Sequence, residues 1–339
     1  MPSYWGKDPP LKLVTNHGPA DRVVAIGDIH GDAGALKKAL RLGGLMGANG
    51  KWTGGKTVLV QVGDIVDRGI EEREAMELLF SLQDQAPKSG GKVYLLLGNH
   101  EVSNLVGSFR FVNKEAASHF GDGGGMLGKI KAGKWMRRHP SREKMFGRLK
   151  AFSGPVAREL GRRTQVSVIV GGSVFVHAGL APHQFFGVMS LPPMEADERW
   201  NDILHDMNVQ TRRWLLSPAD ERRSLLRPKF LNGANTPIFA RYYSRKGVKQ
   251  NSAACTLLNV TLNLVGADRM VVGHSRHPQG ICSNCHKRLW CIDTGMSRAY
   301  KSNGPVEVLE FGRRGRAKVL SDKPNGGQIR NCENQTCGD

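Results

Sequence analysis

The chain has 339 residues, of which 40% are apolar and 23% charged, so it can bury a large core and is too apolar for a disordered protein. Its 49 Lys and Arg outnumber its 30 Asp and Glu, and the formal net charge of +19 favours anionic partners. No apolar run approaches the about 18 residues of a membrane span, and the first residues lack the apolar stretch of a secretory signal, so we expect no membrane association and an intracellular protein, cytoplasmic by default, with an organelle not excluded.

The expected elements begin after an irregular arm. Residues 1–20 contain four prolines and no periodic pattern, so a domain is expected to start at residue 21. Short β-branched runs, each ending in a Gly-Asp or Gly-Asn pair, then alternate with helical patterns. This order predicts a largely parallel or mixed sheet. The expected strands are residues 22–26, 57–62 and 93–97, and the expected helices are residues 33–42 and 70–82.

A long segment interrupts this alternation. Helical patterns broken by glycines over residues 102–165 predict a helical insertion. Within it, residues 129–150 hold nine Lys or Arg and one acidic residue. We interpret this stretch as a solvated amphipathic helix, and the functional alternative is a basic rim that steers an anionic substrate.

The second half of the chain predicts a second sheet packed on the first. Its β-branched runs are bounded by turn residues, which is typical of strands. The domain is expected to end at residue 320, because residues 321–339 are rich in Gly, Asn and Lys and predict a mobile tail. The expected strands are residues 167–170, 173–177, 270–272, 289–292 and 306–310.

Polar residues follow the expected strands at the points where each strand ends. Because strand ends converge on the ligand crevice of open α/β sheets, these side chains are expected to meet. Carboxylate, imidazole and amide groups suit divalent cations, and a carboxylate such as Asp64 can bridge two ions about 3.5–4 Å apart. The six candidate ligands are Asp28, His30, Asp64, Asn99, His177 and His274.

Three further residues supply what phosphoryl chemistry needs besides metal ions. The guanidinium of Arg68 can bind phosphate oxygens bidentately. His100 can protonate a leaving group, and Asp67 can orient His100 and raise its basicity. Any one of these residues alone would more often be a turn cap or a hydrogen-bonded core residue. Their occurrence together, in this order, favours a catalytic site.

The motifs GDIHG, GDIVDRG and LLGNHE, followed by His177-Ala178-Gly179 and Gly273-His274, resemble a known family over about residues 22–310. They are similar to the metal-dependent phosphoprotein phosphatases of the calcineurin-like metallophosphoesterase superfamily. The His-Ala-Gly triplet and the run IDTGMS look most like the Shewanella-like phosphatases. The resemblance implies an α/β fold in which a central β-sandwich of two mixed sheets is flanked by helices, in four layers.

The same resemblance implies a site with two divalent ions. Manganese is the expected metal, and iron or zinc would also suit the ligands. A second phosphate-binding arginine is expected at Arg241, with Arg245 as the alternative within one turn. The resemblance assigns Asp28, His30 and Asp64 to one ion and Asp64, Asn99, His177 and His274 to the other.

The sequence therefore predicts a phosphatase of phosphorylated proteins or peptides. A hydroxide that bridges the metal ions would attack the phosphomonoester directly, on serine or threonine and, as some Shewanella-like members imply, on tyrosine. One alternative is a hydrolase of dinucleoside polyphosphates such as diadenosine tetraphosphate, which shares the three motifs. Another is a basic nucleic-acid-binding module on a phosphatase shell, although the intact set of Asp64, Asn99 and His100 argues against an inactive scaffold.

The six cysteines are too few for a fold built on disulfides. Reduced thiols are the expectation for an intracellular protein, with unpaired loop cysteines at Cys282 and Cys285. The alternatives are a local disulfide within this CxxC pair, or a zinc site that Cys332 and Cys337 complete.

Overall fold

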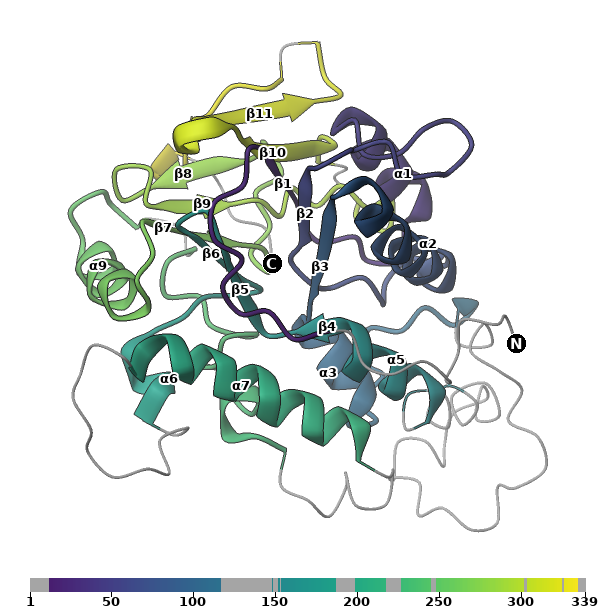
Figure 1. Cartoon of the computed structure of the whole chain (residues 1–339), viewed down its shortest axis with the longest axis horizontal. Helices are drawn as coiled ribbons and strands as arrows, with labels where there is room; N and C mark the ends of the chain where they lie inside the picture. Colours follow the sequence, from purple (N-terminus) through teal and green to yellow (C-terminus); the bar gives the residue numbers. More distant parts are fainter. Residues whose placement is uncertain are drawn as a thin grey trace.

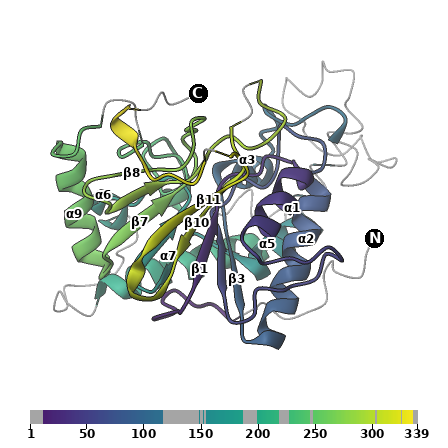
Figure 2. The same ribbon diagram turned by 90° about the horizontal axis from the view of Figure 1, so that it is seen from above.

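The structure is a computed structural model, and it describes residues 12–116, 148, 152, 154–186, 199–217, 227–244, 248–301, 304–324 and 326–334. Two six-stranded sheets pack face to face, with helices on both outer faces (Figures 1 and 2). The layers are therefore helix, sheet, sheet and helix. This arrangement confirms the expected four-layer α/β sandwich.

The first sheet carries the alternating strand and helix units of the N-terminal half. Its strand order is β11-β10-β1-β2-β3-β4, with parallel pairing from β1 to β4 and antiparallel pairing at β10 and β11. Helices α1 (Ala33–Leu42) and α2 (Glu72–Gln85) cover its outer face (Figure 2). The strands are β1 (Val23–Ile26), β2 (Val58–Gln61), β3 (Lys92–Leu96), β4 (Thr164–Gln165), β10 (Glu307–Phe311) and β11 (Ala317–Ser321).

The second sheet is built from the C-terminal half and has the order β12-β8-β9-β7-β6-β5. Helix α9 (Ala253–Val265) lies on its outer side, at the left of Figures 1 and 2. Its strands are β5 (Ser167–Val170), β6 (Ser173–Val176), β7 (Arg269–Val272), β8 (Cys282–Asn284), β9 (Leu289–Cys291) and β12 (Arg330–Asn331).

The remaining helices lie around the ends of the sandwich. Helices α5 (Pro155–Arg163) and α7 (Arg199–Leu216) pack together below the sheets in Figure 1. Their close approach requires Gly161, because a Cβ there would lie 2.9 Å from Leu215 Cβ. The other helical elements are α3 (Asn99–Leu105), α6 (Pro182–Phe186) and the 3-10 helices η1 (Ala86–Ser89), η4 (Lys229–Leu231), η5 (Arg313–Gly315) and η6 (Cys332–Asn334). In the described part of the chain, no helix is long and apolar enough to cross a bilayer.

Burial on both faces explains why the strand runs are apolar throughout. In β1, Val23 and Ala25 face the core between the two sheets, whereas Val24 and Ile26 pack in the core shared with the helices. Alternate residues of a strand point to opposite faces, so a strand covered on both sides needs apolar residues at every position. The strand positions therefore follow from the run of apolar residues.

All eight expected strands and both expected helices are confirmed, with ends that differ by a few residues. The strand at residues 306–310, expected in the second sheet, is instead β10 of the first sheet, where it pairs with β1. The sequence analysis missed β4, β8, β11 and β12. The segment 321–339, for which a mobile tail is predicted, contributes β12 and η6 in its described part. Most of the basic stretch 129–150 lies outside the described residues, with Arg148 as the exception.

The structure corrects the expectation for the cysteines. Cys282 forms a disulfide with Cys332, and Cys285 forms one with Cys255 of α9. The CxxC pair is therefore neither a local disulfide nor two unpaired thiols. Strand pairing explains the difference, because β12 lies beside β8 and brings Cys332 next to Cys282. Cys337 lies outside the described residues.

Candidate active site

The six candidate metal ligands lie at one end of the sandwich, where strands of both sheets end. Asp28 and His30 follow β1, Asp64 follows β2, and Asn99 opens α3 directly after β3. The second sheet contributes the other two candidates, because His177 follows β6 and His274 follows β7. Residues from distant parts of the chain therefore meet across the two sheets.

Asp64 lies at the centre of this group. Its Oδ2 is 3.7 Å from His30 Nε2 and 3.4 Å from His177 Nε2. On the side of the second sheet, the Asn99 Oδ1 is 3.0 Å from His177 Nε2 and 2.8 Å from His274 Nδ1. Asp28 joins the two sheets, because its Oδ2 accepts a hydrogen bond from the backbone N–H of His274 at 3.0 Å.

These side chains form two donor groups that share one carboxylate. His30, Asp64 and His100 offer ligand atoms within 4.8 Å of one another, and so do Asp64, His177 and His274. Carboxylate oxygen and imidazole nitrogen suit divalent cations such as manganese, iron and zinc. A shared carboxylate is also what two neighbouring ions require. The donor set therefore fits a pair of divalent ions.

The backbone of the site is held in a conformation that non-glycine residues rarely adopt. His30, Asp64, Asp67, Arg68 and His274 all have positive φ, from 45° to 70°. Such conformations cost free energy and persist only where the surroundings enforce them, and they concentrate at functional sites. Here the Asp64 carbonyl accepts hydrogen bonds from the backbone N–H groups of Ile29 and His30, at 2.9 Å each.

Buried Glu101 enforces the turn that follows β2. Its carboxylate accepts hydrogen bonds from the backbone N–H of Asp64 at 2.9 Å, Ile65 at 2.8 Å and Gly98 at 2.8 Å. Gly98 must be glycine, because a Cβ there would lie 2.1 Å from Asp64 Oδ1. The Asp64 carboxylate is thus fixed by a buried acid and by the absence of a side chain beside it.

His100, a member of the first donor group, forms a buried pair with Asp67. His100 Nδ1 is 2.7 Å from Asp67 Oδ2, while its Nε2 lies 3.8 Å from Asp64 Oδ2. The other Asp67 oxygen accepts hydrogen bonds from Asn104 at 2.9 Å and from Arg148 at 3.1 Å. Arg148 is fully buried and also pairs with both carboxylate oxygens of Glu72. The His100 ring and the Asp67 carboxylate are therefore held from several sides.

The electrostatics of the site separate the histidines into two kinds. Burial lowers the pKa of His100, but Asp64 and Asp67 outweigh it and leave the pKa raised. Burial and His100 together lower the pKa of His30 to about 3, and burial and His177 lower the pKa of His274 well below its usual value. Burial lowers the pKa of His177, but Asp64 outweighs it and leaves the pKa raised. The raised pKa suits His100 to carry a proton, whereas the lowered pKa of His30 and His274 favours the neutral imidazole that binds a cation.

The site opens onto a pocket of about 390 Å³ that three arginines line. The guanidinium of Arg68 lies 5.0 Å from the ring centroids of Phe111 and of Tyr300. Its buried Nε has no hydrogen-bond partner among the described residues. Arg241 donates to Ser275 Oγ at 2.8 Å and also lines the pocket, as does Arg276. Arg245, the alternative to Arg241, lies outside the described residues.

Comparison with known proteins places this geometry in a family. A family model described as calcineurin-like phosphoesterase matches residues 21–275. The chain belongs to the calcineurin-like phosphoesterases. This phosphoesterase is therefore a hydrolase of phosphate esters. Its family membership implies divalent metal ions, in agreement with the two donor groups.

Relatives and solved structures agree with this family. The phosphoesterase is 31% identical to Shewanella-like protein phosphatase 2 of Arabidopsis thaliana, over 92% of this chain and 80% of the relative. It is 31% identical to Shewanella-like protein phosphatase 1 of Plasmodium berghei, over 81% of this chain and 67% of the relative. The crystal structure of a cold-active protein-tyrosine phosphatase from a Shewanella species shares its fold, with a TM-score of 0.63 and 19% identity over 91% and 82% of the two chains.

Three residues of the phosphoesterase site were not assigned from the sequence. Glu101 stands inside the LLGNHE motif beside His100, so its position was a usable signal. Arg276 lies two residues after His274, and that proximity was a second signal. Arg148 is one of nine basic residues in a stretch interpreted as solvated, and nothing in the sequence separates it from the other eight.

Proposed function

We propose that the protein is a metal-dependent phosphoprotein phosphatase whose catalytic domain spans residues 21–320. The observation that carries the proposal is the position of Asp64, which is shared by two donor groups beneath a pocket lined by arginines. The names of the Shewanella-like protein phosphatases that it resembles support a phosphoprotein substrate.

The proposed metal ligands are the six residues at the strand ends, and His100 of the first donor group is kept for proton transfer. Asp28, His30 and Asp64 would hold one divalent ion, and Asp64, Asn99, His177 and His274 the other. Two metal ions bound there would supply an activated water nucleophile at neutral pH and would withdraw charge from the phosphoryl oxygens. Manganese is the ion that we propose, with iron and zinc as the other metals that the ligands accept.

Arginines would bind the phosphoryl oxygens that face the pocket. Arg68 is suited to this because its buried Nε is free to donate and its guanidinium is stacked between two rings. Arg241 also lines the pocket, and its hydrogen bond to Ser275 Oγ fixes its guanidinium. A planar guanidinium matches two phosphate oxygens at once, which orients the phosphorus for in-line attack.

His100 would protonate the leaving oxygen. Its Nδ1 is engaged by Asp67, so the proton available for transfer is on Nε2. The raised pKa favours the protonated form of His100, which can release the proton as the leaving group develops negative charge. Asp67 orients the ring and stabilises its charged form, and therefore acts through His100.

The pocket offers an exposed aromatic ring to the substrate. Phe111 is 39% exposed and lies beside Arg68, where an aromatic substrate ring can contact it. We therefore propose that phosphotyrosine is accepted together with phosphoserine and phosphothreonine.

The test is a comparison of products with purified protein and Mn²⁺. We expect release of phosphate from phosphotyrosine and phosphoserine peptides, and no activity on either peptide by the Asp64→Asn variant. Asp21→Asn is the carboxylate control, because Asp21 is exposed and pairs with Arg313 on the surface. Hydrolysis of diadenosine tetraphosphate alone would overturn the proposal in favour of a dinucleotide substrate.

A further inference from the structure

A second group of metal-binding side chains lies away from the active site, within the second sheet. It consists of His277, Cys282, Cys291 and Cys332, which we call the sulfur–histidine cluster. Cys282 of β8 and Cys291 of β9 are direct partners in an antiparallel pair, so their side chains share one face. Cys332 follows β12, which pairs with the other edge of β8, and its sulfur is bonded to that of Cys282.

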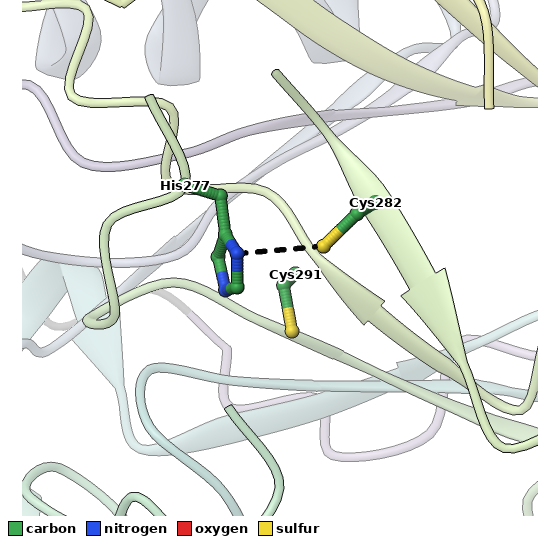
Figure 3. Close-up of side chains that lie close together, drawn as sticks. All are labelled: His277, Cys282 and Cys291. Carbon is green, nitrogen blue, oxygen red and sulfur yellow. Dashed lines mark hydrogen bonds between the residues drawn. The ribbon is translucent and has the colours of Figure 1, made fainter. Parts of the chain in front are cut away.

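His277 completes the cluster from the loop before β8. Figure 3 shows its imidazole directed at the sulfur of Cys282, with the Cys291 sulfur beside both. The His277 Nδ1 is 3.5 Å from Cys282 Sγ, and the ligand atoms of His277, Cys282 and Cys291 all lie within 4.8 Å of one another. The backbone N–H of His277 donates to the Asp293 carbonyl at 2.7 Å, which fixes the loop.

The distance between His277 Nδ1 and Cys282 Sγ matches the geometry of a tetrahedral zinc site. With a zinc–nitrogen bond of about 2.0 Å and a zinc–sulfur bond of about 2.3 Å, a nitrogen and a sulfur ligand lie about 3.5 Å apart. The observed separation of His277 Nδ1 and Cys282 Sγ is the same. One imidazole and three thiolates are also a ligand set found in structural zinc sites.

The side chains of the cluster are buried. Cys282 and Cys291 are fully buried, His277 is 1% exposed and Cys332 is 8% exposed. A buried thiolate without a cation is unfavourable, whereas a bound zinc ion offsets its charge. The disulfide uses two of the four side chains of the cluster, and the zinc site would use all four.

We propose that the sulfur–histidine cluster binds one zinc ion in the reduced protein, and that the Cys282–Cys332 disulfide is the metal-free, oxidised alternative. A dithiol reductant transfers two electrons and two protons to the disulfide and is itself oxidised to a disulfide. Zinc then binds the neutral His277 and the three thiolates of Cys282, Cys291 and Cys332, and three protons are released. Either state fastens the segment after β11 to the second sheet.

The second disulfide provides an internal control. Cys255 and Cys285 are as buried as the cluster cysteines, and Cys285 lies only three residues from Cys282. In the part of the chain that the structure describes, neither belongs to a group of side chains close enough to share an ion. Its reduction should therefore create two thiols without creating a metal site.

Cobalt spectroscopy tests the proposal, because only sulfur ligands give a thiolate-to-cobalt charge-transfer band. The proposed catalytic ligands contain no sulfur, so a metal ion bound there does not contribute. The full chain is reduced with dithiothreitol under nitrogen, six thiols are verified, and Co²⁺ is added after removal of the reductant. We expect a near-ultraviolet band with tetrahedral visible bands, which Zn²⁺ in excess over all three proposed ion sites removes.

Variants assign the band to the cluster. We expect its loss in Cys291→Ser and in His277→Ala, and its retention in Cys255→Ser as the matched control. Absence of the band in the fully reduced wild-type protein overturns the proposal. A band that persists in Cys291→Ser but disappears in Cys255→Ser overturns it as well.

A measurement on the wild-type chain avoids the case in which a variant fails to fold. The reduced protein is alkylated with iodoacetamide, with Zn²⁺ or with a chelator, and the modified peptides are identified by mass. We expect zinc to slow the modification of Cys282, Cys291 and Cys332 and to leave that of Cys255 and Cys285 unchanged. Equal rates with and without zinc at all five cysteines would contradict a zinc site in the cluster.

Discussion

In the proposed mechanism, His100 transfers a proton with the help of Asp67, and other residues bind the metal ions. His100 contacts the proposed metal ligand Asp64 only at 3.8 Å, but it is bound to Asp67 at 2.7 Å. We expect His100→Asn to slow kcat by about 10²- to 10⁴-fold, which is the usual contribution of a general acid. The metal content, measured by elemental analysis, should remain that of the wild type. Loss of metal in this variant would contradict the role assigned to His100.

Asp67 sets the pH range in which His100 holds its proton. Burial lowers the pKa of His100, and the charges of Asp64 and Asp67 raise it above its ordinary value of 6.5. The acid form is therefore complete below this raised pKa and is lost as the pH rises through it. Asp67→Asn removes one of the two raising charges, so the alkaline limb of the kcat–pH profile should move to lower pH. Asp21→Asn, at an exposed carboxylate that pairs with Arg313, should leave the profile unchanged.

The sequence predicted which residues belong to the site, but not their backbone conformation or their burial. The candidate ligands could be predicted because each polar residue follows an apolar strand run, and strand ends of this fold class converge. The positive φ of His30 and Asp64 could not, because it depends on hydrogen bonds between separate loops. The same holds for Arg148, whose burial depends on packing that a basic stretch does not reveal.

At the scale of elements, the insertion contributes the buried residue Arg148 to the site. Arg148 is fully buried and pairs with Asp67 and Glu72, so its removal would leave two buried carboxylates without their cation. We expect Arg148→Ala to lower the free energy of unfolding by about 3–5 kcal/mol, as measured by urea denaturation, and to lower kcat by releasing Asp67. The exposed Arg158 on α5 is the control, and Arg158→Ala should change stability by less than about 0.5 kcal/mol. Equal effects of the two variants would contradict the structural role of Arg148.

The sequence predicted the apolar strands well but missed short strands such as β8 and β12. β1, β2 and β3 are buried on both faces and need apolar residues throughout, which makes the runs visible. β8 and β12 have the sequences CSN and RN, and each is held by its neighbours and by the Cys282–Cys332 disulfide. Their positions depend on tertiary contacts, which override local propensity.

At the scale of the whole molecule, the net charge of +19 is expected to attract an anionic substrate and to raise its association rate. Steering by surface charge raises association rates by about 10- to 10³-fold and is screened as the Debye length falls from about 30 Å at 0.01 M salt to about 8 Å at 0.15 M. We expect kcat/KM for an acidic phosphopeptide to fall by about tenfold over this range, with kcat unchanged. A phosphopeptide with neutral flanking residues should respond less, and an equal response of both peptides would argue against steering by the basic surface.

The active-site ligands come from both sheets, and this has a consequence for the cohesion of the sandwich. Asp28 and Asp64 follow strands of the first sheet, whereas His177 and His274 follow strands of the second. A cation coordinated by both sets would cross-link the two layers at one end, and a ligand that binds only the folded state stabilises it by about 2.7 kcal/mol at 100 times its Kd. Chelation should therefore lower the melting temperature as well as stop turnover, so that thermal resilience depends on metal supply.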